Sequence, residues 1–184
     1  IYPGDKNGTQ ILMNTIDDVL GLEIHYYGIV TFELFEDVIN TLGGVEVNVE
    51  NAFTDSYYPV EGKESDPIIS NRYQTISFEQ GLQLMDGETA LMYARSRKGN
   101  NNEGTDFARS KRQQNVIEAI KNKVFSAQTL LNVNTVIGLY EDYKNNVDTN
   151  IDLPSLQSFY TISQQVNFDN VISVVLDDRS LEED

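Results

Sequence analysis

The sequence predicts a single α/β domain in which helices flank both faces of a central mixed sheet, an α/β/α arrangement. Two observations predict this class. Segments with apolar residues at helical spacing alternate with short segments rich in β-branched and aromatic residues. The length of 184 residues and the 40% hydrophobic content suit one core of ordinary domain size. We therefore expect one domain over residues 1–184.

The first half of the chain is predicted to alternate helix and strand. Thr9 can cap a helix whose apolar residues recur every three or four positions until Gly21. Residues 25–32, HYYGIVTF, are rich in aromatic and β-branched residues and predict a strand. A second helical stripe ends at a pair of glycines, and VEVNV at 45–49 alternates strictly, which predicts another strand.

The second half is predicted to open with a loop and to continue mainly as helices. Residues 51–75 contain two of the four prolines and many polar residues, so we expect a loop, and its length is typical of a functional or mobile segment. Helical spacing follows over 86–97, 107–125, 127–144 and 154–166, and VISVVL at 171–176 predicts a buried strand.

The composition excludes several kinds of site. The chain has no cysteine, which excludes disulfides, zinc–thiolate sites and thiol nucleophiles. His25 is the only histidine, which excludes a His-based catalytic triad and a multi-histidine metal site. No run of residues approaches the length of a membrane-spanning helix. We therefore expect either a soluble protein or one whose anchor lies upstream of Ile1.

Positive charge is concentrated in one segment. The formal net charge is −16, which argues against broad nucleic-acid binding because phosphate backbones require an extended positive surface. Eight of the thirteen Lys and Arg residues nevertheless lie between Leu91 and Phe125, against three acidic residues. A compact anion such as a phosphate fits this distribution better than a nucleic acid does.

Arg109 is predicted to point inward from its helix. On a helix over 107–125, at about 100° per residue, an apolar stripe formed by Val116, Ile120 and Val124 faces the core, and Arg109 falls on the same stripe. An unpaired buried guanidinium is costly, so it must meet an anion. Asp106, just before this helix, is placed to cap backbone N–H groups, and the same helix start attracts anions.

Two further arginines are expected near Arg109. Arg95 and Arg97 reach the same neighbourhood through a Gly/Asn-rich turn, KGNNNEG, and arginine forks are suited to bidentate phosphate contacts. In the alternative interpretation, the three arginines pair with abundant carboxylates and Asp106 is only a helix cap. Spacing alone favours that alternative, because ion-pair networks are common and phosphate sites are rare.

The arginine segment also resembles a known signature. GETALMYARSRKGNNNEGTDFARSKRQQNVIEAI is similar to the LytR-CpsA-Psr family pattern, in which AL-x-Y-x-R-x-R is followed after a short loop by D-[FY]-x-R-x-x-R-Q. Upstream, LMNTIDDVLGLEIHYYGIVTFELFEDVINTLGGVEVNV is similar to the helix, strand and GGV-x-V region of the family. The likeness runs from about residue 9 to residue 176.

The resemblance implies an α/β/α fold and an extracytoplasmic phosphotransferase, membrane-anchored in the full-length protein, of Gram-positive cell-wall assembly. Its implied partners are a polyprenyl-pyrophosphate-linked anionic glycopolymer, such as teichoic acid or capsule, the peptidoglycan that receives it, and the membrane through an N-terminal anchor. Nucleic acid is not among them. The implied cofactor is Mg²⁺ or Mn²⁺.

The resemblance also implies a role for each residue of the signature. Pyrophosphate contacts fall to Arg95, Arg97, Arg109 and Gln113. Asp106 would orient these arginines or lie near the metal, and Arg112 would support them. The family's metal-binding aspartates lie on strands expected upstream of Ile1, so we expect an N-terminally incomplete catalytic domain over 1–184, with metal binding weak or absent.

Two other classes of function stay open at this stage. The first is a catalytically incomplete module that binds a polyprenyl phosphate or a glycan. Its candidate sugar-stacking residues are Tyr57, Tyr58 and Tyr73, and its candidate tunnel-lining residues, otherwise plain core, are Leu12, Ile16, Phe35 and Ile39. The second is a transcriptional regulator, against which the acidic composition counts.

Overall fold

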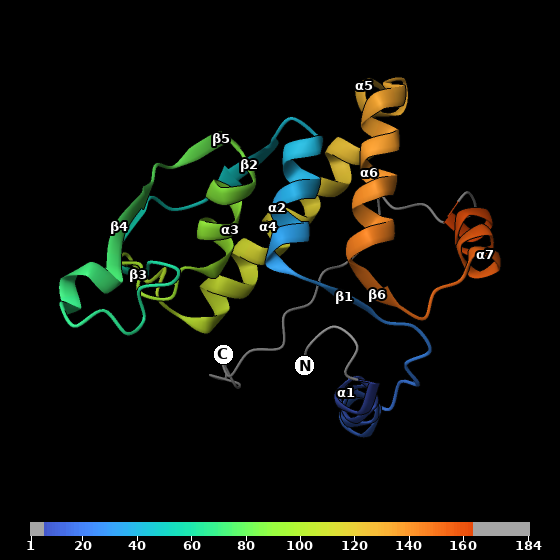
Figure 1. Cartoon of the computed structure of the whole chain (residues 1–184), viewed down its shortest axis with the longest axis horizontal. Coiled ribbons are helices and arrows are strands. Elements are labelled where there is room, and N and C mark those ends of the chain that lie inside the picture. Colours follow the sequence, from blue (N-terminus) through green and yellow to red (C-terminus); the bar gives the residue numbers. More distant parts are fainter. Residues whose placement is uncertain (1–5, 164–184) are drawn as a thin grey trace, which may run out of the picture. The chain divides into compact units, whose positions relative to one another are not determined.

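A computed structural model describes residues 6–163 of the chain. The order of elements is α1 (Lys6–Leu20), β1 (Gly28–Val30), α2 (Phe32–Thr41), β2 (Val45–Val49), β3 (Phe53–Pro59), the 3₁₀ helix η1 (Ile69–Arg72), β4 (Tyr73–Phe78), β5 (Gly81–Met85), α3 (Gly87–Arg95), α4 (Asp106–Val124), α5 (Ala127–Leu130), α6 (Val133–Asn146), β6 (Val147–Thr149) and α7 (Leu153–Ser163) (Figure 1). The predicted strand at 171–176 lies outside the described residues.

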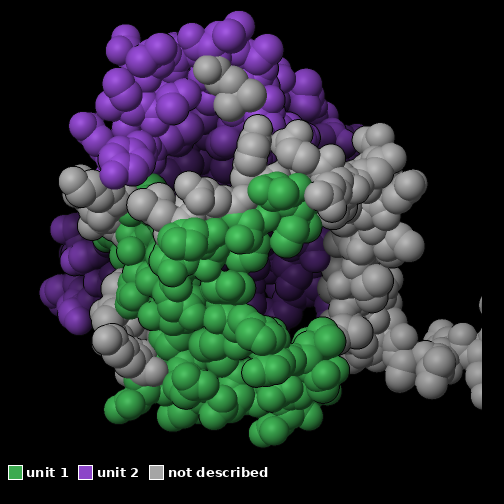
Figure 2. Space-filling view, turned by 90° about the vertical axis from the view of Figure 1, so that its right-hand side faces the viewer, with its two compact units in different colours: residues 1–34, 142–174 green, residues 35–141, 175–184 purple. Residues whose placement is uncertain are grey.

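The chain divides into two compact units, coloured separately in Figure 2. Among the described residues, one is formed by residues 6–34 and 142–163, the other by residues 35–141. In the first unit β1 pairs antiparallel with β6, and the ring of Tyr26 meets that of Phe159 edge to face at 5.0 Å. The predicted strand at 25–32 is thus reduced to three residues, because Phe32 already begins α2. No helix within 6–163 is long and apolar enough to cross a membrane.

The second unit contains two separate two-stranded antiparallel sheets. β2 pairs with β5 from Val45 opposite Met85 to Val49 opposite Gly81. β3 pairs with β4, with a register shift between Asp55 and Tyr58. The predicted α/β class is confirmed. The sheet differs from the expected central mixed sheet, since the strands of the described part form three separate two-stranded antiparallel sheets.

The predicted loop at 51–75 is wrong. Most of this segment is β3, η1 and the start of β4. The prolines do not interrupt the strand, because Pro59 is the last residue of β3 and Pro67 lies in the connection that follows. The predicted helix at 127–144 is also divided, since Asn132 caps a new helix, α6, by accepting a hydrogen bond from the Thr135 N–H at 3.2 Å.

The core of the second unit lies between the sheets and helices α2, α3 and α4. Alternation in β2 buries the side chains of Val45, Val47 and Val49, as predicted, because period-2 residues share one face. α4 packs on β2 and on α3. The first residue of α3, Gly87, lies so close to α2 that a Cβ built on it would stand 2.5 Å from the Glu36 carbonyl oxygen. α3 thus packs against both α2 and α4.

Candidate anion site

The candidate site forms where α3 ends and α4 begins. The Asp86 carboxylate caps α3 by accepting from the Thr89 N–H at 2.9 Å, and α3 ends at Arg95. α4 is capped by Thr105, whose hydroxyl accepts from the Ala108 N–H at 3.1 Å. The prediction that Asp106 is the cap is therefore wrong. Asp106 is the first helical residue, so its carboxylate is free to contact side chains.

Asp106 brings two of the predicted arginines together. Its Oδ1 lies 2.8 Å from Arg109 Nη1, one helical turn along α4, and 3.6 Å from Arg97 Nη2, just beyond α3. The side chains of Asp106 and Arg97 are 72% and 67% exposed, whereas that of Arg109 is 25% exposed. Both guanidinium groups thus converge on one solvent-facing carboxylate at the positive end of a helix.

Gln113 and Arg95 lie on the adjoining surfaces of the same two helices. Gln113 Nε2 donates to the Ala94 carbonyl oxygen at 3.5 Å, next to Arg95 in the chain. The half-buried Arg95 lies near the buried Tyr58. Burial raises the pKa of the Tyr58 hydroxyl, and the positive charge of Arg95 partly opposes this rise. The structure thus brings Arg97 and Arg109 together at Asp106, with Gln113 on the same helix, whereas Arg95 is found near Tyr58 of β3.

Arg112, assigned only a supporting role by the resemblance, is the deeply buried arginine of α4. Its side chain is 2% exposed and lies over the Phe53 ring at 4.9 Å. Nη1 is 2.6 Å from Glu103 Oε2, and Nε donates to the Tyr93 carbonyl oxygen at 2.9 Å. Arg109 is thus not the most inward-facing arginine, which corrects the helical-wheel prediction.

Two buried charges hold the segment that carries Arg97. From one side, Arg112 Nη2 donates to the Ser96 carbonyl oxygen at 2.5 Å. From the other, Asp55 Oδ2 accepts from the Ser96 hydroxyl at 2.7 Å, the Lys98 N–H at 3.0 Å and the Arg97 N–H at 3.3 Å. Residues 96–98 are therefore fixed through their backbone and one hydroxyl.

The Asp55 carboxyl is held in its ionised form. Burial raises its pKa, but hydrogen bonds from the Ser96 hydroxyl and from the N–H groups of Tyr57, Lys98 and Arg97 outweigh burial and bring the pKa below its ordinary value. The Tyr57 N–H reaches Oδ1 at 2.9 Å.

The Gly/Asn-rich turn between the two helices is tied to β3. The Asn100 N–H donates to the Thr54 carbonyl oxygen at 3.1 Å, and its side-chain oxygen accepts from the Thr54 N–H at 2.8 Å. Asn101 Nδ2 donates to the Ala52 carbonyl oxygen at 2.8 Å. Asn101 and Asn102 adopt φ values of 55° and 66°, in a region that asparagine tolerates better than most residues. The turn is therefore an ordered link between the site and the sheet.

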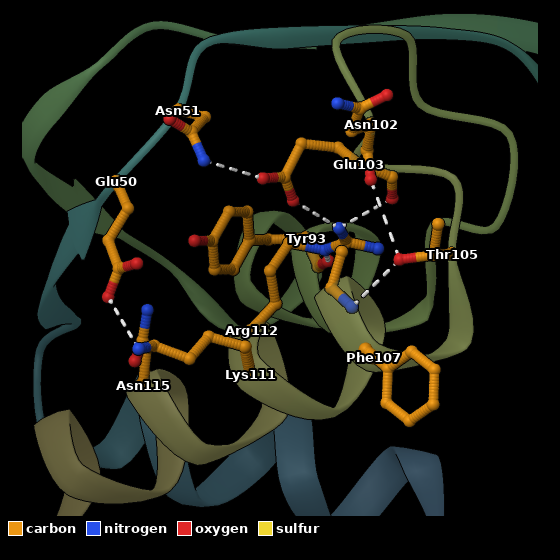
Figure 3. A pocket seen from close by; sticks show the side chains of 11 residues that line it. Glu50, Asn51, Tyr93, Asn102, Glu103, Thr105, Phe107, Lys111, Arg112 and Asn115 are labelled. Carbon is orange, nitrogen blue, oxygen red and sulfur yellow. Dashed lines mark hydrogen bonds and ion pairs between the residues drawn. The ribbon is translucent and has the colours of Figure 1, made fainter. Parts of the chain in front are cut away.

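A pocket of about 600 Å³ lies on the other flank of α4 (Figure 3). Its lining residues are Glu50, Asn51, Tyr93, Asn102, Glu103, Thr105, Phe107, Ala108, Lys111, Arg112 and Asn115. Figure 3 shows its two charge pairs, Arg112 with Glu103 and Lys111 with Glu50, the latter at 3.3 Å. None of the predicted contact residues Arg95, Arg97, Arg109 and Gln113 lines it. The pocket and the arginine cluster are thus separate features.

The described residues do not themselves fit a divalent metal ion. Within 6–163, no group of three or more His, Asp or Glu side chains is placed to hold one. Asp106 is already engaged by two arginines, whereas Mg²⁺ requires near-octahedral oxygen ligands.

Sequence reasoning missed Asp55 and Glu103 as parts of the site's support. Asp55 lay in the segment predicted as a loop, although FTDSYYP carries the aromatic and β-branched residues of a strand. Glu103 lay in the Gly/Asn-rich turn and gave no signal of its own.

Two arginines thus meet one carboxylate at the N-terminus of a helix, within a mixed α/β fold. Residues 3–181 match the LytR_cpsA_psr family, and the chain belongs to that family.

Three relatives illustrate the likeness. The polyisoprenyl-teichoic acid–peptidoglycan teichoic acid transferase TagU of Bacillus licheniformis is 33% identical over 83% of this chain and 44% of its own length. The regulatory protein MsrR of Staphylococcus aureus is 32% identical over 78% of this chain and 38% of its own length. The crystal structure of B. subtilis TagV matches with a TM-score of 0.58 and 31% identity, covering 88% of this chain and 54% of that one. The chain thus spans less than half the length of these two curated relatives.

Proposed function

We propose that this chain is the pyrophosphate-binding part of a phosphotransferase that moves an anionic glycopolymer, of the teichoic acid or capsule type, from a polyprenyl-pyrophosphate carrier to peptidoglycan. The observation that carries the proposal is the convergence of Arg97 and Arg109 on Asp106, with Gln113 farther along the same helix. Family membership and relatives named as teichoic acid transferases support the same assignment.

The arginines would act by neutralising charge. A phosphoryl group in transfer carries negative charge on its non-bridging oxygens, and fixed guanidinium groups stabilise that charge without reorganising during the reaction. Asp106 holds Arg109 at 2.8 Å before a ligand arrives, which lowers the cost of ordering it, and Arg97 lies farther from the same carboxylate, at 3.6 Å. A bound pyrophosphate would displace the exposed carboxylate from one or both forks and take its place.

The remaining parts of the proposal come from the family. The transferase would act outside the cytoplasm and be anchored in the cell membrane, with carrier-linked glycopolymer and peptidoglycan as partners. Mg²⁺ or Mn²⁺ would be its cofactor, with ligands beyond the described residues. A metal requirement is tested by adding EDTA and then excess Mg²⁺ to the full-length protein during a glycopolymer transfer assay.

The anion site is tested by titrating pyrophosphate into the chain and following backbone amide shifts. We expect saturable changes at Arg95, Arg97 and the first turn of α4, and loss of binding when Arg97 and Arg109 are both replaced by Met. The matched control is Lys121→Met, which removes an exposed charge near the end of α4. Shifts scattered over the surface, or binding that survives the double replacement, would refute the site.

One observation favours a regulator as a second candidate, namely that the relative MsrR is named a regulatory protein. A net charge of −16 opposes DNA binding through its phosphates. DNA titrations at several salt concentrations decide the matter, because a regulator that binds DNA directly would give an affinity that falls steeply as salt rises.

A further inference from the structure

Asp55 lies behind the arginine site and touches the segment that leaves α3. Its side chain is among the most deeply buried in the structure, with the residue only 1% exposed. Three of its four hydrogen bonds come from residues 96–98, and all three end on Oδ2. A carboxylate oxygen can accept several hydrogen bonds at once, so it can hold several neighbouring backbone groups in place.

These bonds set the direction in which Arg97 leaves the backbone. At Ser96 the chain departs from helical geometry, with φ −52° and ψ 135°, so the next residues are no longer oriented by the α3 ladder. Asp55 supplies the orientation instead, by holding the N–H groups of Arg97 and Lys98. The Cα–Cβ direction of Arg97 follows from this backbone geometry.

The position of the backbone matters because the Arg97 side chain has little other support. It is 67% exposed, and its ion pair with Asp106 is long at 3.6 Å. If the backbone at Arg97 were mobile, binding would have to order both the backbone and the long side chain, and the lost conformational entropy would weaken the affinity. Because the backbone of residues 96–98 is already held, this entropic cost of binding is smaller.

We propose that Asp55 is a positioning residue of the anion site, acting through residues 96–98 to place Arg97 for its phosphate contact. The inference rests on the proposed function, because it assumes that Arg97 contacts a phosphate. It assigns Asp55 no contact with the ligand.

A charged carboxylate is required rather than any polar side chain. Asparagine offers one acceptor oxygen and one amide group. If its oxygen takes the three donors from 96–98, its NH₂ group faces the Tyr57 N–H, and donor meets donor. If the amide is reversed, its NH₂ group faces the N–H groups of Arg97 and Lys98, and only the Ser96 hydroxyl can turn to accept from it.

The experiment compares pyrophosphate binding and amide spectra of the wild-type chain with those of Asp55→Asn and Ser96→Ala. We expect Asp55→Asn to weaken pyrophosphate binding by about 10- to 100-fold, by analogy with the loss seen when residues that orient metal ligands are replaced. Ser96→Ala removes a single bond to Oδ2 and should weaken binding less, in the same direction. The amide signals of Arg97 and Lys98 should move in both variants before ligand is added.

Ile76→Ala is the matched control. Ile76 lies opposite Asp55 in the β3–β4 pairing and is also buried, so its replacement loosens the same sheet without touching residues 96–98. It should lower stability while leaving pyrophosphate affinity and the two amide signals unchanged. If Asp55→Asn fails to fold, Ser96→Ala against Ile76→Ala decides the question.

The outcomes separate this inference from the function on which it rests. If the wild-type chain binds pyrophosphate and the folded Asp55→Asn variant, or Ser96→Ala where that variant does not fold, binds it equally well, the positioning role is wrong while the anion site stands. If Ile76→Ala weakens binding as much as the site variants do, Asp55 acts only through stability and the inference fails. If the wild-type chain does not bind pyrophosphate, the proposed function falls first and the inference falls with it.

Discussion

Arg109 and Arg112 are three positions apart on α4, but their environments differ enough to give them different energetic roles. Arg112 is almost fully buried against Phe53 and Tyr93, and its donors are taken by Glu103 and by backbone carbonyls. Arg109 is partly exposed and pairs with a carboxylate that faces solvent. Removing one member of a buried ion pair is expensive, whereas exposed pairs contribute little to stability.

Replacing Arg112 by Met should therefore destabilise the fold strongly. The change removes the cation that pairs with the Glu103 carboxylate, whose side chain is 12% exposed, and it removes the hydrogen-bond donor to the carbonyl oxygens of Tyr93 and Ser96. We expect a loss of about 3–5 kcal/mol in the free energy of unfolding, measured by denaturant melts. Lys111→Met, next along the helix but half exposed, should change it by less than about 0.5 kcal/mol. Equal losses in the two variants would contradict the burial argument.

Arg109→Met should have the opposite profile. Because its partner Asp106 is 72% exposed, loss of the pair should change the unfolding free energy by no more than about 1 kcal/mol. Pyrophosphate binding should be abolished, because one of the converging guanidinium groups is gone. A denaturant melt beside a pyrophosphate titration measures both. Large destabilisation with binding intact would assign Arg109 to structure alone.

The lowered pKa of Asp55 gives stability a defined pH dependence. As pH falls, Asp55 is protonated in the unfolded chain at a higher pH than in the folded chain. Between the two pKa values the free energy of unfolding therefore rises with pH. The contribution is fully present above the unfolded pKa of about 3.9 and is lost as pH falls through the lower folded pKa. Urea melts between about pH 6 and pH 2 should show a shallower acid loss for Asp55→Asn than for the wild type. Parallel curves would mean that the carboxylate is not specially held.

Among the elements, α4 shows how far the sequence alone leads. The helix, its start near residue 106 and the burial of Val116 are all predicted correctly. The helical wheel places Arg109 on the core-facing side because it takes Val116, Ile120 and Val124 as the buried stripe. Ile120 and Val124 do pack on the core, but they are only partly buried. Ala119, about 100° back around the helix from Ile120, is buried and turns the core-facing side toward Arg112. Because alanine contributes little to a hydrophobic pattern, the buried face of α4 could be identified only from the residues that pack against it.

β3 shows a different limit. Its strand character was masked by two prolines and by polar residues, and Asp55 has the appearance of a loop residue in the sequence. Its hydrogen bonds reach residues 41 to 43 positions away. No local periodicity encodes such contacts, because they depend on which strand docks beside the end of α3. The arginines of the signature were found from their motif, but the residues behind them required the fold.

Close packing of α2 against α3 makes Gly87 a sensitive position. An added methyl group would stand 2.5 to 2.8 Å from the backbone atoms of Glu36, so the two helices must move apart. We expect Gly87→Ala to cost about 1–3 kcal/mol, the usual cost of overpacking, in a thermal or denaturant melt. Gly28→Ala is the control, because a Cβ there meets nothing within 4 Å. Similar stability of the two variants would show that the helices yield easily.

At the scale of the whole molecule, excess negative charge opposes compaction. The chain carries 29 acidic side chains against 13 basic ones, and folding brings them closer together. Raising NaCl from about 10 mM to about 150 mM shortens the screening length from about 30 Å to about 8 Å, which weakens this repulsion. We expect the Tm to rise by about 2–4 °C, equivalent to about 1 kcal/mol for a chain of this size.

The salt prediction is separated from anion binding by its control. The variant in which both Arg97 and Arg109 are Met should show the same rise in Tm, because screening acts on the whole charge distribution. A rise confined to the wild type would point to chloride at the arginine site. A fall in Tm would show that attractive pairs outweigh the repulsion.

The hydrogen bond between Asp55 and Ser96 also determines at which step of folding the arginine site forms. Closing a loop of 41 residues costs chain entropy that local helix formation does not. α3 and α4 can form early from local contacts, but residues 96–98 gain their orientation only when β3 has docked. In a chain whose β3 has not yet docked, the backbone that carries Arg97 is therefore not yet oriented. Under the proposed function, the ability to hold a pyrophosphate would therefore arise late in folding, together with the completed core.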